Sequence, residues 1–113
     1  MKVDALNLIN SFKRRVAAHD RIDTIADGIG VRVPIPQAVE DMRGLVDDAV
    51  LVTEGAIVRG MRLLHRHAGI VAEPSAAVGI AALLEHPEAF RDELVGTIVC
   101  GSNLTGEQME RWL

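Results

Sequence analysis

The chain has 113 residues and a mass of 12.2 kDa, enough for one domain, and its 49% hydrophobic composition is that of a globular protein. A net charge of −4, with one Trp, two Phe and no Tyr, argues against nucleic-acid binding, which needs a basic face and often aromatic stacking platforms. No stretch is apolar enough to cross a bilayer, no apolar signal core follows the N-terminus, and the single Cys100 excludes an internal disulfide, so a cytoplasmic location is expected.

The N-terminal half is expected to hold two helices and a strand. Apolar residues spaced by three and four positions predict an amphipathic helix over residues 4–16. Glycines and prolines interrupt regular structure between residues 19 and 36, and Pro36 is well placed in the first turn of a short helix at 36–44. An apolar run then predicts a strand at 46–52.

Two further helices are predicted in the middle of the chain. Thr53 can cap a helix that Gly69 can end, and the apolar residues between them share one face. Residues 75–84 carry no charge and almost no polar group, which predicts a helix buried on all sides. Its many small residues would allow the close approach of a neighbouring backbone or of a ligand, although helix packing alone also accounts for them.

The C-terminal segment is expected to begin with a buried strand. Residues 95–100 are uncharged and rich in β-branched side chains, as in a parallel sheet with helices on both faces. Thr105 can then cap a last helix that runs to Trp112. The order of elements predicts an α/β fold in which helices pack on a small, mainly parallel sheet, within a single domain over residues 1–113 and without an internal boundary.

The sequence contains no recognisable metal site or phosphate loop. His65 and His67 are two positions apart, so on a helix they point in different directions, and the other two histidines have no ligand-type neighbours at a known spacing. Gly28 and Gly30 are too few for a phosphate-binding loop and lack its strand-then-helix setting. No metal is therefore expected in this chain.

Two positions are candidates for ligand contact. Cys100 lies at the predicted carboxyl end of a strand, before a turn that carries Gly101 and Asn103, and ligands of open α/β sheets bind outside such strand ends. The cysteine can equally be a small buried hydrophobe. Glu73 precedes the apolar helix, where its charge must reach solvent, a hydrogen-bond donor or a ligand.

Three motifs, taken in order, resemble a known family. They are Thr24-Ile25-Ala26-Asp27-Gly28-Ile29, Glu73-Pro74-Ser75-Ala76-Ala77 and Cys100-Gly101-Ser102-Asn103. Together they resemble the C-terminal portion of the pyridoxal-phosphate-dependent threonine/serine dehydratases of fold type II, in the tryptophan synthase beta-like family. The resemblance runs from about residue 11 to the end of the chain, which would make the chain an incomplete part of that fold.

The resemblance implies pyridoxal 5'-phosphate as the cofactor of the complete enzyme. Cys100 would contact the pyridine nitrogen, Gly101 and Asn103 would shape the loop beside the ring, and Glu73 would lie near the ring edge. Ser102 stands where the family often has a second glycine. The family reaction is that of a lyase, which converts a hydroxy amino acid to a 2-keto acid and ammonia.

The lysine that holds the cofactor in this family, its phosphate loop and any metal ligands lie upstream of the matching region. The chain has two lysines, Lys2 and Lys13. Ser11-Phe12-Lys13 is superficially similar to the family's lysine motif, but it lies too close to Thr24, so we interpret Lys13 as a helix-surface residue. No catalytic residue is expected within this chain.

Two functions are compatible with these observations. In the first, the chain is the C-terminal part of a dehydratase that needs a complementary N-terminal cofactor-binding portion or chain, acts on threonine or serine, and forms a homo-oligomer. In the second, it is a non-catalytic, self-associating α/β interaction module derived from that family, because two strands are too few for an independently stable sheet. The sequence does not distinguish threonine from serine as substrate.

Overall fold

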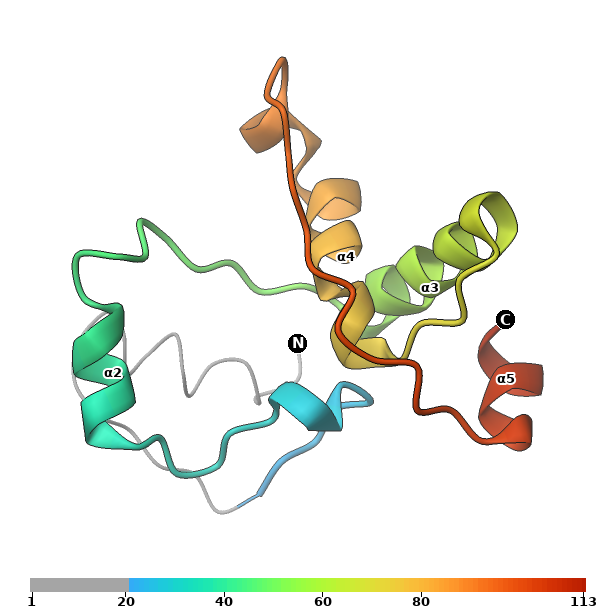
Figure 1. Cartoon of the computed structure of the whole chain (residues 1–113), viewed down its shortest axis with the longest axis horizontal. Helices are drawn as coiled ribbons and strands as arrows, with labels where there is room; N and C mark the ends of the chain where they lie inside the picture. The colour runs from blue at the N-terminus through green and yellow to red at the C-terminus, as the bar shows by residue number, and fades with distance from the viewer. Residues whose placement is uncertain (1–20) are drawn as a thin grey trace. The chain divides into compact units, whose positions relative to one another are not determined.

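The computed structural model describes residues 21–113, and every regular element in this range is a helix. The chain divides into two compact units, Met1–Leu51 and Val52–Leu113, and Figure 1 shows the helices of both. No helix of the described range is long and apolar enough to span a membrane. The helix expected at residues 4–16 and the interpretation of Lys13 fall outside the described residues.

The described part of the first unit contains a 3-10 turn, η1 (Asp27–Ile29), and the helix α2 (Pro36–Met42). Pro36 begins α2 as predicted, because its ring fixes φ at a helical value and the first turn needs no N–H at that position. The helix ends slightly earlier than expected, at Met42, and Gly44 lies in the following turn with a φ of 77°. The predicted helix at 36–44 is therefore confirmed with a shorter C-terminal end.

Helix α3 (Glu54–Ala68) is the longest in the described chain and agrees with the sequence prediction. Its first turn is capped by Thr53, whose Oγ1 accepts the Ala56 N–H at 3.2 Å. Gly69 ends it in the left-handed conformation with a φ of 66°, which glycine adopts without steric cost. The residues that α3 buries lie on one face: Ala56, Ile57, Gly60 and Met61.

Helix α4 (Val78–Glu85) packs against α3 and is preceded by the 3-10 turn η2 (Pro74–Ala77). Small residues allow the close approach. A Cβ added at Gly60 of α3 would lie 3.1 Å from the carbonyl oxygen of Ala77. Helix packing therefore accounts for part of the small-residue pattern in this segment.

The prediction of one continuous helix at residues 75–84, buried on all sides, is wrong in two respects. The segment begins as 3-10 structure rather than α-helix, and Leu84 near its far end is exposed. Pro74 begins the 3-10 turn, and the Ala76 N–H closes it by donating to the carbonyl of Glu73 at 3.0 Å. Burial is concentrated in η2 and at Ala81 of α4, and both elements pack against α3.

A second contact ties the end of α4 to the start of α3. The Glu85 carboxylate accepts the backbone N–H of Thr53 at 2.8 Å and the Thr53 hydroxyl at 2.5 Å. These two hydrogen bonds, assisted by the nearby charges of Arg59 and His86, hold the pKa of Glu85 below its ordinary value. The capping residue of α3 is thereby fixed by a charge from the neighbouring helix.

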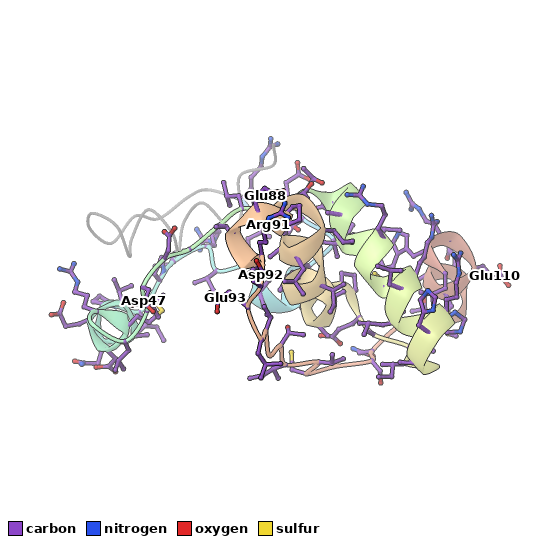
Figure 2. All side chains as sticks on the ribbon, turned by 90° about the horizontal axis from the view of Figure 1, so that it is seen from above. Asp47, Glu88, Arg91, Asp92, Glu93 and Glu110 are labelled. Carbon is purple, nitrogen blue, oxygen red and sulfur yellow. The ribbon has the colours of Figure 1, made fainter. Side chains whose placement is uncertain are left out.

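The 3-10 turn η3 (Pro87–Phe90) follows α4 and leads into a charged turn (Figure 2). Arg91 Nη2 lies 2.5 Å from Glu88 Oε1, in an exposed pair that contributes little to stability. Asp92 has a φ of 62°, a left-handed conformation that aspartate tolerates better than most residues. At this turn the chain reverses and runs back along α4 (Figure 1).

Helix α5 (Gly106–Trp112) is the last element and was predicted at residues 105–112. A capping box holds its start, since the Gln108 N–H donates to Thr105 Oγ1 at 3.2 Å and the Thr105 N–H donates to Gln108 Oε1 at 2.9 Å. Arg62 of α3 donates from Nε to the carbonyl of Trp112 at 2.7 Å. This bond joins the C-terminal helix α5 to the middle of α3.

Neither predicted strand is present in the described chain. Residues 46–52 and 95–100 have no regular structure, and the supposedly buried segment 95–100 is exposed, with Ile98 82% accessible. A strand needs a neighbouring strand to pair with its backbone N–H and C=O groups, and no strand is formed within residues 21–113. Helices α2, α3 and α5 agree with the α/β prediction, whereas the sheet and the single domain remain predictions.

Candidate functional site

The loop at residues 100–103 meets Glu73, which lies thirty positions earlier than Asn103. The Glu73 N–H donates to the carbonyl of Gly101 at 3.0 Å, and the Asn103 N–H donates to Glu73 Oε2 at 3.1 Å. Three of the four residues singled out from the sequence, Glu73, Gly101 and Asn103, are therefore in direct contact. We call this contact the Glu73 junction.

The backbone of Glu73 is fixed from both sides. On one side, Gly69 reverses the chain after α3, and the Ile70 N–H donates to the Leu64 carbonyl at 3.2 Å. Ala72 is then fully buried. On the other side, Pro74 starts η2 directly after Glu73. The carboxylate is therefore presented from a backbone that has little freedom to move.

Gly101 is required by the closeness of the carboxylate. A Cβ added at Gly101 would lie 2.5 Å from both Cδ and Oε2 of Glu73, well inside van der Waals contact. Any side chain here would displace the carboxylate and break its bond to the Asn103 N–H. The glycine thus has a steric role at this position and needs no unusual φ.

Cys100 lies next to the junction with an exposed thiol. Segment 95–100 forms no strand in the described chain and Cys100 is exposed, so its place at the tip of a buried strand stays a prediction. The alternative of a small buried hydrophobe does not agree with this exposure. A neutral thiol is a weak hydrogen-bond donor, and in this position it is accessible to a partner molecule.

Sequence reasoning gave no role to Ser75, although the structure places it two residues from Glu73 in a buried position. Its Oγ has no hydrogen-bond partner among residues 21–113, and the residue is 5% exposed. A buried hydroxyl without a partner costs about 1–3 kcal/mol. The signal in the sequence is a single hydroxyl at the start of an otherwise apolar run.

The histidines do not assemble with other metal-ligand side chains in the described range. Across residues 21–113, no group of three or more His, Cys, Asp or Glu side chains is placed to hold a metal ion. His65 and His67 are exposed in the last turn of α3.

Comparison with known proteins identifies the family. A model of the pyridoxal-phosphate dependent enzymes matches residues 1–101, so the chain belongs to this family. The cofactor of the complete enzymes is pyridoxal phosphate, and the motif-based resemblance is thereby confirmed at the level of the family.

Among curated relatives, the beta-hydroxyaspartate dehydratase of Paracoccus denitrificans is 37% identical over 90 residues, which cover 79% of this chain and 28% of that protein. The catabolic L-threonine dehydratase of Staphylococcus aureus is 37% identical over 101 residues, which cover 86% of this chain and 29% of that protein. The chain therefore spans less than a third of the length of these relatives.

Solved structures agree with this assignment. A threonine deaminase from T.th. superposes with a TM-score of 0.83 at 27% identity, covering 90% of this chain and 38% of that one. Maize serine racemase superposes with a TM-score of 0.78 at 27% identity, covering 96% of this chain and 34% of that one. The solved structures that this chain resembles are thus fold type II enzymes, of which it matches a part.

Proposed function

We propose that this chain is the C-terminal part of a pyridoxal-phosphate-dependent threonine/serine dehydratase and forms the wall of the cofactor site that faces the pyridine ring. The observation that supports this most strongly is the Glu73 junction with its adjacent exposed thiol, in a chain of this family. Relatives named for threonine and for beta-hydroxyaspartate point to α-amino acids with a β-hydroxyl as the substrate class.

The residues at the junction fit one edge of a pyridoxal ring. Cys100 offers a neutral donor for the ring nitrogen, and the absence of a side chain at Gly101 lets the Glu73 carboxylate lie directly against this loop. Glu73 would lie at the ring edge, where the Asn103 N–H holds its carboxylate in place. The buried Ser75 hydroxyl is a further polar group near this edge that has no partner among residues 21–113.

When bound, the cofactor supplies an electron-withdrawing ring that acidifies the Cα–H of an amino acid. A thiol at the ring nitrogen leaves that nitrogen largely unprotonated, whereas a carboxylate would favour its protonation. The ring beside Cys100 would therefore withdraw electrons less strongly, which suits loss of a β-hydroxyl. The net reaction releases ammonia and a 2-keto acid, because the water lost in elimination returns in hydrolysis.

The rest of the site must come from elsewhere. The described residues contain no lysine and no glycine-rich phosphate loop. We propose that a complementary N-terminal portion or chain supplies both, completes the small, mainly parallel sheet, and joins residues 1–113 in a single domain. A homo-oligomeric, cytoplasmic enzyme, as expected from the family resemblance and the single cysteine, is part of the same proposal.

Reconstitution tests this function. The chain is co-expressed with the N-terminal portion of the Staphylococcus aureus L-threonine dehydratase that precedes the matching region, and 2-keto acid and ammonia are measured with L-threonine and L-serine. We expect an active pair and an inactive isolated chain. Keto acid from the isolated chain, or none from a purified pair that contains the cofactor, contradicts the proposal.

Substitutions at Cys100 test its role within the active pair. Cys100→Ser keeps a neutral donor and should retain most activity, whereas Cys100→Ala should reduce the rate by roughly tenfold, about the effect of one lost hydrogen bond of 1.4 kcal/mol. Ser102→Ala, on the exposed neighbour, is the matched control and should have little effect. Equal rates for Cys100→Ala and Ser102→Ala would contradict a role for the thiol.

A further inference from the structure

Residues 94–99 form a segment whose backbone is unpaired. The segment has no helix or strand, and among the described residues none donates a backbone hydrogen bond to it or accepts one from it. It contains no charged residue, although exposed strand edges in soluble proteins are normally protected by charges, prolines or bulges. An uncharged, β-branched, unpaired segment is the kind of backbone to which another strand can add.

The exposure of its side chains alternates along the chain. Leu94 is fully exposed and Ile98 is 82% exposed, whereas Val95 and Val99 are only 40% and 37% exposed. Side chains of an extended segment point alternately to its two faces, so this period of two indicates one partly shielded face and one bare face. Both faces are apolar, which is typical of a strand that is covered on both sides.

Helix α4 contacts the less exposed face. Thr97, in the less exposed register, lies against Gly79 of α4 so closely that a Cβ at Gly79 would overlap the Thr97 hydroxyl. Figure 1 shows the segment running along α4. The contact fixes which face of the segment is turned to the helix, and it leaves Leu94 and Ile98 on the opposite face.

Resting on the proposed function, we propose that residues 94–99 are the docking edge for the complementary polypeptide, which adds a β-strand beside them and covers Leu94 and Ile98. The chain spans 28–29% of the length of its curated relatives, so most of their fold lies outside it. The segment lies inside the region that matches the family, residues 1–101. The occupant is therefore the part of the fold that this chain does not contain.

A second copy of this chain is the less favoured occupant. Two copies that paired through residues 94–99 would form a ribbon of two strands, which is marginally stable in water. Such a ribbon would also leave the faces with Leu94 and Ile98 uncovered, unless further copies packed on them. A larger polypeptide with strands and helices of its own can satisfy both the backbone and the apolar face.

Docking at this edge would also position the thiol. Cys100 follows the segment directly, and a shift of one residue in strand register would turn every side chain to the other face. The contact of Thr97 with Gly79 fixes the face on one side, and the added strand would fix the register on the other. The partner would therefore set the direction of Cys100 through the backbone.

The test uses two variants that remove equally exposed apolar side chains. Ile98→Lys changes the proposed edge, and Leu45→Lys is the matched control in the first unit, because both side chains are 82% exposed. Each tagged chain is co-expressed with the N-terminal portion of the Staphylococcus aureus L-threonine dehydratase, and the co-purified amount and the dissociation constant are measured. Because Ile98 and Leu45 are both exposed, neither substitution should unfold the chain.

The wild-type chain and Leu45→Lys should bind alike, and Ile98→Lys should bind roughly ten- to hundredfold more weakly, the change expected for the lost burial of one isoleucine. Backbone amides of residues 94–99 should exchange quickly in the free chain and slowly in the complex. Equal binding of both variants, or absence of any complex with the wild-type chain, overturns the proposal.

Two further outcomes separate this inference from the proposed function. A complex that is lost with Ile98→Lys but releases no keto acid supports the docking edge and contradicts the dehydratase. An active complex that is insensitive to Ile98→Lys supports the dehydratase and overturns the docking edge. Concentration-dependent dimers of the isolated chain that disappear with Ile98→Lys assign the edge to a second copy and overturn the proposed occupant.

Discussion

Gly101→Ala tests the Glu73 junction at its tightest point. The added Cβ would lie 2.5 Å from Cδ and Oε2 of Glu73, so the carboxylate must swing away from the loop. The flexible end of the side chain can move, and the main loss is therefore the hydrogen bond from the Asn103 N–H, now 3.1 Å long. Hydrogen bonds to charged groups contribute about 1.5–3 kcal/mol, and exposure of this one places the expected loss near 1 kcal/mol.

A matched glycine isolates this loss. Replacing glycine by alanine also restricts the unfolded chain, which stabilises by about 0.4–1 kcal/mol at compatible positions. Gly96→Ala carries the same contribution without a clash, because a Cβ there meets no atom within 4 Å. The free energy of unfolding is measured by urea denaturation of the full chain, followed by far-ultraviolet circular dichroism. It should be lower for Gly101→Ala than for Gly96→Ala by about 1 kcal/mol or slightly more.

A double-mutant cycle attributes the effect to the carboxylate. In a Glu73→Ala background the added methyl group no longer meets Cδ and Oε2, so Gly101→Ala should behave like Gly96→Ala. The expected coupling energy between Glu73 and Gly101 is about 1 kcal/mol, within the range of contacting residues. A loss of equal size in both backgrounds would refute the steric role given to Gly101.

Two other contacts yield predictions of the same kind. Hydrogen bonds from Thr53 lower the pKa of Glu85 in the folded chain. Their contribution to the free energy of unfolding is therefore complete above the ordinary pKa of 4.5, and it is lost as the pH falls through the lowered value. Glu85→Gln should therefore reduce the acid-dependent drop in the free energy of unfolding, and an unchanged pH profile would contradict this contact. Gly79→Ala should destabilise by about 1–3 kcal/mol through overlap with Thr97, although alanine favours a helix by about 1 kcal/mol. In a Thr97→Gly background, Gly79→Ala should lose most of this destabilisation, as measured by urea denaturation. An equal loss in both backgrounds would contradict the packing of residues 94–99 on α4.

Local signals in the sequence were sufficient to place the starts of helices α2, α3 and α5. Thr53 and Gly69 bound α3 because capping and the left-handed end are decided within one turn of the chain. The same holds for Thr105 at the start of α5 and for Pro36 at the start of α2. Such features depend on neighbouring residues, and a missing partner does not alter them.

The strands could not be predicted in this way, because pairing depends on residues far away in sequence. The pattern of residues 95–100 correctly indicated an apolar, β-branched segment, and it could not reveal that no neighbouring strand is available within the described chain. The exposure of Cys100 follows from the same absence. The family resemblance placed Glu73, Gly101 and Asn103 at one site. The hydrogen bond from the Asn103 N–H to Glu73 and the burial of the Ser75 hydroxyl are visible only in the structure.

Chemical labelling of Cys100 tests the central proposal most directly, because this chain has a single cysteine. Alkylation by iodoacetamide is followed by the mass of this chain, in the pair reconstituted with and without pyridoxal phosphate. A thiol that contacts the pyridine ring should react roughly tenfold or more slowly when the cofactor is present, and quickly in the isolated chain. Equal alkylation rates with and without the cofactor, in a pair that binds it, would show that Cys100 does not face the ring.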